Sequence, residues 1–280
     1  MRVSAYVLVA DPAFLRESIL AYYDRVDRIV LSYDETSTSW TGTPLPVAEC
    51  LGLIESVDTE HKCVRAPGRY ARLGHHPLEN DTFQRQCALA EASDGADWVL
   101  QLDTDEVVLD AARFFRALRR AEATGSSGLD FPARWLYAHV GRRCYLEASS
   151  RFWRARGGYP GPVAVRAGTR LVQARQAEVP LYRVDLRPWN TDPSHHHLSS
   201  VHETVPLDSA IAHYSWVRDD ETMRRKFGWS GHTDAYSKPE VYRRWVARQR
   251  HPVRTVLTTP FRRDDWFRLA RVPEARGASL

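Results

Sequence analysis

The most constraining feature of the sequence is residues 98–106, WVLQLDTDE, where a short apolar run ends in three carboxylates within four residues. In an extended chain, alternate side chains point the same way, so Asp103 and Asp105 can converge on one cation while Leu100 and Leu102 stay buried. Oxygen ligands of this kind suit Mg²⁺ or Mn²⁺, which share their ligand shell with substrate phosphates. A solvated loop after a buried strand is the competing interpretation. The run therefore predicts either such a loop or a metal site for a phosphorylated substrate.

Strand-like and helix-like patterns alternate in the chain before this run. Such alternation predicts an α/β fold, with a mainly parallel sheet flanked by helices. Ligands of these sheets bind outside the carboxyl ends of the strands. The first two strands end at Asp11 and Asp34, so acidic groups should gather along one sheet edge with the acids of residues 103–106. The expected strands cover residues 3–10, 26–33, 63–65 and the run from Trp98, and the expected helices cover 12–23, 47–55 and 82–93.

The pattern changes after Asp110, where the β-leaning segments become rich in aromatic residues and Arg. These segments are candidates for antiparallel strands that extend the sheet. Residues 186–200 contain Pro, Asn and Asp without periodicity, which indicates a surface loop, and loops of that length are often binding loops. The further expected helices cover residues 111–123, 239–250 and 260–270, and the β-leaning segments cover 129–140, 144–153 and 164–172.

Composition bounds the class of protein. With 280 residues, 43% hydrophobic and 26% charged, the chain has the composition of a globular protein with a sizeable core. The sequence has no Lys-rich arm and no RNA-binding fingerprint, which argues against nucleic acid as a partner. Residues 1–14 are too short an apolar segment for a signal peptide or membrane span, so a cytoplasmic location is expected. The predominance of Arg over Lys, with many Ala, is typical of a GC-rich bacterial genome. The four cysteines form no C-x-x-C pair, so neither a disulfide framework nor a zinc ribbon is indicated.

The order of these motifs resembles the family 2-type glycosyltransferases with the GT-A (nucleotide-diphospho-sugar transferase) fold. The motifs are Asp11, VDRIVLSYDE at 26–35, Arg85 on a helix, the WVLQLDTDE strand and IAHYSW at 211–216. The resemblance covers roughly residues 1–230 and is specific in LQLDTDE and IAHYSW. It implies a nucleotide-sugar-binding half (1–110), an acceptor-side half (111–230) and a basic helical C-terminal extension (231–280).

The resemblance also implies a site that holds a nucleoside diphosphate sugar and Mn²⁺ or Mg²⁺. Asp105 would be the direct metal ligand, Asp103 a ribose or metal contact, and His213 the third partner. Arg85 would contact a phosphate, although a solvated arginine on a helix face is the alternative. A core histidine bonded to the backbone is the alternative for His213. The implied contacts of the nucleoside are Ala10, Asp11 and Asp34.

Sugar transfer needs charge stabilisation on the leaving diphosphate and a base for the acceptor hydroxyl. A single base implies inversion at the sugar. In inverting relatives, this base is an acid about ninety to a hundred residues after the DxD, and here that acid is Glu203. The acidic pair usual in the family is absent, and His202 either orients Glu203 or is itself the base. Asp192 and Asp208 are rivals for the role.

Three further segments have two interpretations each. The adjacent His195, His196 and His197 cannot all face one ion, which argues against a zinc site there. The cluster Arg224-Arg225-Lys226 either grips a diphosphate or anionic acceptor, or is a solvated helix face. The amphipathic basic segment 260–271 either touches a membrane surface or packs on the domain. Acceptor contacts are expected from residues 186–200 and from the aromatic-rich region 135–153, while the acceptor itself stays open among glycans, lipid-linked glycans, proteins and small molecules.

Two other functions compete with glycosyl transfer. LQLDTDEVV also fits the motif of haloacid dehalogenase-like phosphatases, in which Asp103 would be the nucleophile and Asp105 a general acid. That motif normally lies on the first strand, and the lysine that such enzymes place downstream has no counterpart between positions 62 and 226. A non-catalytic sugar-nucleotide-binding protein is the second alternative. A sugar-nucleotide-forming nucleotidyltransferase is disfavoured because no Gly-rich loop follows the first strand, and a P-loop enzyme because no G-x-x-x-x-G-K occurs.

Overall fold

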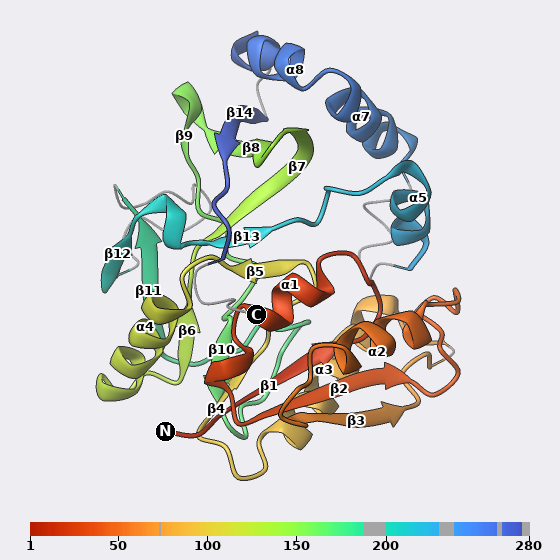
Figure 1. The fold of residues 1–280 in the computed structure, drawn as a ribbon, viewed down its shortest axis with the longest axis vertical. Coiled ribbons are helices and arrows are strands. Elements are labelled where there is room, and N and C mark those ends of the chain that lie inside the picture. Colours follow the sequence, from red (N-terminus) through yellow and green to blue (C-terminus); the bar gives the residue numbers. More distant parts are fainter. Residues whose placement is uncertain (73, 188–199, 230–237, 262–264, 276–280) are drawn as a thin grey trace.

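The computed structural model describes residues 1–72, 74–187, 200–229, 238–261 and 265–275. Within these ranges the larger sheet has eight strands, in the order β12-β11-β6-β10-β4-β1-β2-β3 (Figure 1). β10 is antiparallel to both of its neighbours, and the other neighbouring strands pair in parallel. The predicted mixed α/β fold with a mostly parallel sheet is confirmed. The strands are β1 (Val3–Leu8), β2 (Arg28–Asp34), β3 (Cys63–Gly68), β4 (Trp98–Leu100), β6 (Gly128–Asp130), β10 (Ala164–Arg166), β11 (Leu181–Leu186) and β12 (Glu203–Val205).

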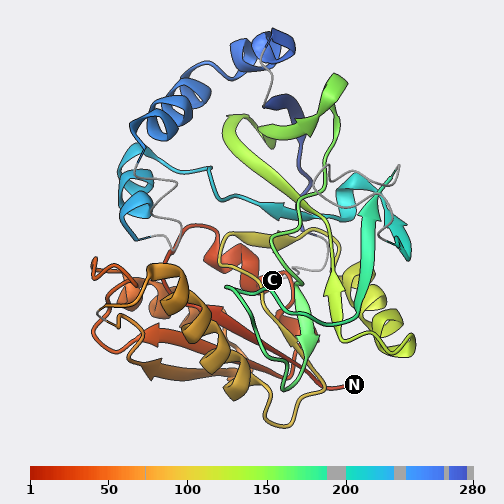
Figure 2. The same cartoon turned by 180° about the vertical axis from the view of Figure 1, so that it is seen from behind.

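Helices cover both faces of this sheet. Every residue of β1 and β4 is buried, as expected for central strands that are covered on two sides. One face packs against α1, α2 and α4 in the main core, and the other packs against α3. Figure 2, seen from behind, shows α3 crossing the strands β1 to β3. The helices are α1 (Leu15–Leu20), α2 (Val47–Glu55), α3 (Pro77–Ala92) and α4 (Ala111–Ala123), with a 3-10 turn η1 at Tyr23–Arg25.

A second sheet begins where the acidic run ends. Its order is β14-β8-β7-β13-β5, with β9 paired to β8. β5 starts at Glu106, directly after Asp103 and Asp105, so the acidic turn connects the two sheets. β13 pairs antiparallel with β5 and places His213 opposite Glu106. The strands are β5 (Glu106–Val108), β7 (Ala133–Gly141), β8 (Cys144–Ser150), β9 (Arg154–Ala155), β13 (Ile211–His213) and β14 (Trp266–Arg271).

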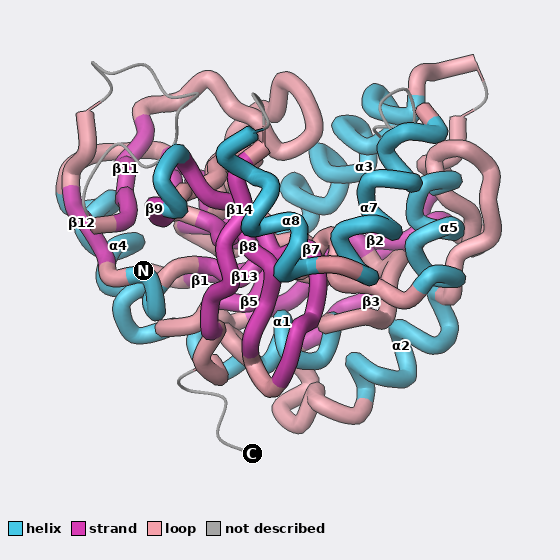
Figure 3. Tube along the Cα trace, turned by 90° about the horizontal axis from the view of Figure 1, so that it is seen from above, coloured by secondary structure: helices cyan, strands magenta, loops and turns pink. Residues whose placement is uncertain are grey.

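The C-terminal region lies against the second sheet. α7 contacts β7 and α8 contacts β14, and in Figure 3 these helices and α5 lie on the outside of the strands. None of the helices in the described ranges has the length and apolar character needed to cross a membrane. The remaining helical elements are α5 (Asp220–Trp229), α7 (Pro239–Arg250), α8 (Pro252–Thr258), and the 3-10 turns η2 (Arg151–Trp153), η3 (Leu207–Ser209) and η4 (Thr259–Phe261).

The predicted helix over residues 260–270 is wrong, because Trp266–Arg271 forms the strand β14. All six of its residues pair antiparallel with β8, from Trp266 opposite Ser149 to Arg271 opposite Cys144. Phe267 is buried with Ala138 and Leu146 in a small cluster between this strand and its neighbours. Pairing with a strand more than a hundred residues away overrides the local helical pattern. The C-terminal extension is therefore only partly helical.

A buried ion pair ties β14 into the second sheet. The Arg134 Nε lies 2.7 Å from Glu147 Oε1, and both side chains are fully buried. Arg268 of β14 donates a hydrogen bond from Nε to Glu147 Oε2 at 2.9 Å. Glu147 thus compensates two guanidinium groups from two different strands.

We predict that Glu147→Gln lowers the free energy of unfolding by about 3 to 5 kcal/mol, because it leaves a buried guanidinium uncompensated. Urea unfolding measures this change. The control is Glu55→Gln, whose partner Arg65 and own side chain are 56% and 63% exposed. That exposed pair should contribute at most about 1 kcal/mol. Equal losses in the two variants would contradict the assignment of Glu147 as a structural anchor.

Candidate functional site

A cavity opens at the carboxyl ends of β1, β2 and β4, where ligands of parallel sheets bind. Its walls come from both sheets and from α3 and α5. Trp135 of β7, Ser215 and Lys226 of α5 line it beside the predicted residues. The sequence-predicted residues that the structure brings together here are Ala10, Asp11, Asp34, Arg85, Asp103, Asp105 and His213.

A buried ion pair shapes the acidic turn. Glu106 is fully buried, and its two carboxylate oxygens accept hydrogen bonds from Arg175 at 2.5 and 2.7 Å. The Glu106 Oε2 also accepts the backbone N–H of Asp103 at 3.0 Å, and Ser18 Oγ donates to the backbone oxygen of Glu106 at 2.8 Å. The third carboxylate of the run therefore holds the turn and is not among the residues that line the cavity.

Arg85 binds Asp103. Its Nη2 lies 2.8 Å from Asp103 Oδ1, and its Nε lies 2.7 Å from Asp81 Oδ1. The arginine is only 7% exposed, so the interpretation of Arg85 as a solvated helix-face residue is wrong. Burial alone would raise the pKa of Asp103, but the charges of Arg85 and Arg175 outweigh it, and the pKa is lowered. Asp103 is consequently held as a carboxylate.

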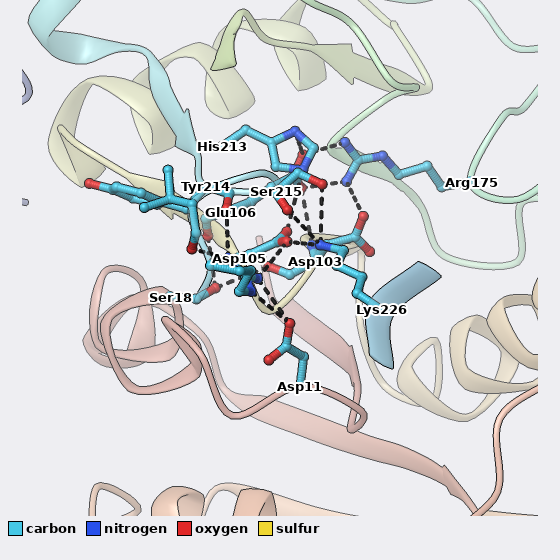
Figure 4. Close-up of polar contacts among 12 residues, drawn as sticks. Asp11, Ser18, Asp103, Asp105, Glu106, Arg175, His213, Tyr214, Ser215 and Lys226 are labelled. Atoms are coloured by element: carbon cyan, nitrogen blue, oxygen red, sulfur yellow. Dashed lines mark hydrogen bonds and ion pairs between the residues drawn. The ribbon is translucent and has the colours of Figure 1, made fainter. Parts of the chain in front are cut away.

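Asp105 is surrounded by nitrogen atoms (Figure 4). Its Oδ1 lies 3.3 Å from His213 Nε2, and its Oδ2 lies 2.7 Å from Lys226 Nζ. Arg218 Nη2 lies 3.0 Å from the same Oδ2 and 2.9 Å from Asp11 Oδ2, so this guanidinium bridges two carboxylates. Burial would raise the pKa of Asp105, but Lys226, His213 and Arg218 together hold it well below its usual value.

The contact between Asp105 and His213 also shifts the pKa of the histidine. Burial alone would lower the pKa of His213, but the hydrogen bond and negative charge of Asp105 outweigh it, and the pKa is raised. The ring also packs on Trp135, with 4.7 Å between ring centroids. The pairing of β13 with β5 places this histidine, since Tyr214 N donates to the backbone oxygen of Asp105 at 2.9 Å.

The expected metal site at Asp103, Asp105 and His213 does not fit this arrangement. Among the described residues, no group of three His, Cys, Asp or Glu side chains is placed to hold a metal ion. Both oxygens of Asp105 already face cationic or histidine nitrogens, and Oδ1 of Asp103 is bound by Arg85. Asp103 and Asp105 therefore contact side-chain cations at the positions where Mn²⁺ or Mg²⁺ was expected.

Asp34 lies at the cavity but its oxygens are committed to the protein. Oδ1 accepts hydrogen bonds from the N–H and hydroxyl of Thr36 at 3.0 and 2.5 Å. Oδ2 accepts the backbone N–H groups of Tyr70 and Ala71 at 2.7 and 3.1 Å. Burial would raise the pKa of Asp34, but these hydrogen bonds outweigh it, and the pKa is lowered. In this structure Asp34 holds together the loops that follow β2 and β3.

The candidate bases Glu203 and His202 are not brought to the cavity. Glu203 begins β12, where its Oε2 lies 2.6 Å from Arg120 and 3.2 Å from the Tyr182 hydroxyl. His202 Nδ1 accepts the backbone N–H of Arg183 at 3.1 Å, and its ring stacks on Tyr182. β12 lies four strands from β4, about 19 Å at about 4.8 Å per strand.

The other candidate residues are placed as follows. Asp208 is exposed in η3. Asp192, the histidines at 195–197 and most of the expected binding loop at 186–200 lie outside the described residues. In the basic cluster of α5, Arg224 and Arg225 are 64% and 51% exposed, whereas Lys226 reaches Asp105.

Three residues of the site were not predicted as such from the sequence. Arg175 is preceded by no motif, and its role depends on a contact 69 residues away in the chain. Arg218 follows the IAHYSW motif by two residues, and that proximity is the signal that could have indicated it. Trp135 was covered only by the expectation of aromatic acceptor contacts over 135–153.

Comparisons with known proteins give no family. No protein-family model matches the sequence, and no curated protein matches it. Among solved structures, the chain is similar to a 4-diphosphocytidyl-2C-methyl-D-erythritol synthase from Anaerococcus prevotii, with a TM-score of 0.34 and 11% identity over 59% of this chain and 71% of that chain.

Two further solved structures show similar values. A mannose-6-phosphate isomerase from Helicobacter pylori has a TM-score of 0.28 and 13% identity, over 54% of this chain and 57% of that chain. A mannose-1-phosphate geranyltransferase from Thermus thermophilus has a TM-score of 0.29 and 13% identity, over 61% of this chain and 51% of that chain. At TM-scores below 0.5, these likenesses carry no statement about function.

We predict that Asp34→Asn lowers the free energy of unfolding near neutral pH by about 1 to 3 kcal/mol, because an amide cannot accept all of these hydrogen bonds. The pKa of Asp34 is below its ordinary value of 3.8, so its contribution is present above that pH and is lost as the pH falls below it. Urea unfolding of both proteins at about pH 6 and about pH 3 should show the difference between them shrinking at the lower pH. Thr36→Val should give a smaller change in the same direction. A difference that stays constant or grows at low pH would refute this account.

Proposed function

We propose that the chain is a glycosyltransferase of the GT-A type that takes a nucleoside diphosphate sugar as donor. The observation that carries the proposal is the acidic turn at the carboxyl end of β4, which joins two sheets and presents Asp103 and Asp105 to a cavity between them. The division into a donor half (1–110) and an acceptor half (111–230) belongs to this proposal.

The cavity offers three chemically different parts for such a donor. The ends of β1 and β2 with Trp40 supply an apolar and polar wall suited to a nucleoside. Arg85 and Lys226 also line the cavity and are the side-chain cations that would contact a diphosphate. Trp135, from the proposed acceptor half, provides an aromatic face suited to a sugar ring. A nucleoside, a diphosphate and a sugar placed in that order would span the cavity from β2 to β7.

The turn is built for rigidity. Glu106, Arg175 and Ser18 fix the backbone on both sides of Asp103 and Asp105. Preorganised charges cost little reorganisation when charge develops on a leaving group. This supports a role for the turn in holding the reacting end of a donor.

The phosphatase alternative gains no support from the arrangement. As a nucleophile, Asp103 would need a carboxylate oxygen free to attack phosphorus. Its Oδ1 is bound by Arg85 at 2.8 Å, which leaves only Oδ2, 4.0 Å from Arg175, for that role. β4 also follows three earlier parallel strands of the same sheet, whereas the phosphatase motif belongs on the first strand.

The first test is a panel of four nucleoside diphosphates, those of uridine, guanosine, thymidine and adenosine. Binding is measured as a rise in the temperature at which the protein unfolds. One of them should stabilise the protein, by about 2.7 kcal/mol at a hundredfold excess over the dissociation constant. Asp103→Asn should weaken that stabilisation, whereas the control Asp97→Asn should not, because Asp97 lies before β4 at its other end and is 48% exposed. The corresponding nucleotide sugar should be hydrolysed slowly in the absence of an acceptor.

The outcomes separate the candidate functions. Absence of a response to every nucleotide would refute the glycosyltransferase proposal. Binding of a nucleotide sugar with no turnover towards water or any acceptor would instead favour the non-catalytic sugar-nucleotide-binding protein. Release of phosphate from simple phosphate esters, lost in Asp103→Asn, would favour the phosphatase.

We predict that Glu203→Gln changes the hydrolysis rate of the donor by less than about twofold, because Glu203 lies far from the cavity and is bound to Arg120. A general base contributes about 10² to 10⁴-fold to a rate, so the two interpretations are well separated. A loss of that size, with donor affinity unchanged, would restore Glu203 as the base.

A further inference from the structure

The Lys226 ammonium lies in a cage of oxygen atoms. Its Nζ is 2.7 Å from Asp105 Oδ2, 3.1 Å from the backbone oxygen of Ser215 and 3.2 Å from Ser215 Oγ. A carboxylate, a carbonyl and a hydroxyl are the ligand types that hard cations take in proteins. The lysine also lines the cavity, with 16% of its side chain exposed. The position that a metal ion would take beside Asp105 is thus occupied by a side-chain cation.

The charges around the acidic turn are nearly balanced by the protein itself. Five carboxylates lie within 4.0 Å of four cationic side chains, which gives a net charge of −1 when His213 is neutral (four minus five). Without Lys226 the net charge would be −2 (three minus five). The carboxylates are Asp11, Asp81, Asp103, Asp105 and Glu106, and the cations are Arg85, Arg175, Arg218 and Lys226.

Three residues of α5 are held by their surroundings, and they lie on both sides of Lys226 in the chain. Thr41 Oγ1, in the loop after β2, donates a hydrogen bond to the backbone oxygen of Gly228 at 2.7 Å. Met223 of the same helix is 1% exposed, and Phe227 packs edge-on against Trp216. The helix is therefore held on both sides of Lys226, and the three hydrogen bonds of Nζ hold the end of the side chain.

The residue at position 226 is a lysine, whose ammonium is a more compact cation than the guanidinium of an arginine. Lysine accounts for three of the 39 Lys and Arg residues in the chain. An ammonium is a compact point charge with three donors, whereas a guanidinium is a planar fork. Three oxygens around one nitrogen match the ammonium.

We propose that Lys226 takes the place of a divalent metal at the donor diphosphate, so that the site binds a nucleoside diphosphate without metal. The inference rests on the proposed function, because it concerns the donor of that reaction. The ammonium neutralises Asp105 and lines the cavity, where a phosphate oxygen would replace a Ser215 oxygen as the acceptor of one of its three N–H groups. Removal of Lys226 changes the net charge of the cluster from −1 to −2 and leaves Asp105 with Arg218 and His213 as its partners, and this makes the site more attractive to Mn²⁺.

The test is calorimetric titration with the nucleoside diphosphate that gives the largest response in the panel, in buffer with EDTA and in buffer with Mn²⁺. The wild-type affinity should agree within about twofold in the two buffers, and Lys226→Ala should lose at least about tenfold in EDTA. Mn²⁺ should restore part of that loss. Lys226→Met keeps the length of the side chain without its charge and covers the case in which the alanine variant unfolds. Arg225→Ala, an equal change of charge at a 51% exposed position on the same helix, should behave as wild type.

A second readout needs no nucleotide. Electron paramagnetic resonance of added Mn²⁺ should show binding to Lys226→Met and none to wild type. Nucleotide binding by wild type only in the presence of Mn²⁺, or wild-type affinity of Lys226→Met in EDTA, would overturn the inference and leave the proposed function standing. If no nucleoside diphosphate binds under any of these conditions, both the inference and the proposed function fail.

Discussion

The buried pair between Glu106 and Arg175 is the interaction on which the rest of the site depends. It joins the end of β4 to the start of β5, because Arg175 also donates a hydrogen bond to the backbone oxygen of Gln101 at 2.9 Å. A buried bidentate pair holds its geometry tightly, and loss of one partner would leave a buried charge. The two sheets meet at this point, so the angle between them and the direction of Asp103 and Asp105 are set together.

The local patterns of the sequence predicted the parts of the fold that are held by local interactions. The boundaries of α2, α4 and α7 match the expected helices, since each has its own periodicity and caps or prolines. The sequence predicts the strand ends at Asp11 and Asp103 because buried parallel strands consist of continuous apolar residues, and an acidic residue marks where such a run stops. The candidate donor residues gather at one cavity for the same reason.

The features that the sequence did not predict depend on contacts between residues far apart in the chain. β14 was expected as a helix because its partner β8 lies more than a hundred residues earlier in the chain. The prediction of Glu203 as the base rests on its distance along the sequence from the acidic run. That distance does not determine where in the sheet the residue lies. Lys226 reaches Asp105 across 121 positions, a contact that only the fold reveals.

The pairing of β14 with β8 has a consequence for the order in which the molecule is completed. During synthesis, the parallel strands β1 to β4 can pair with one another before residues 266–271 have been made. The second sheet cannot be finished then, because Arg268 and the backbone oxygen of Arg271 contribute to the buried cluster of Glu147 and Arg134. The sheet that carries His213 is therefore completed only after residues 266–271 have been made, although β13 itself is made earlier.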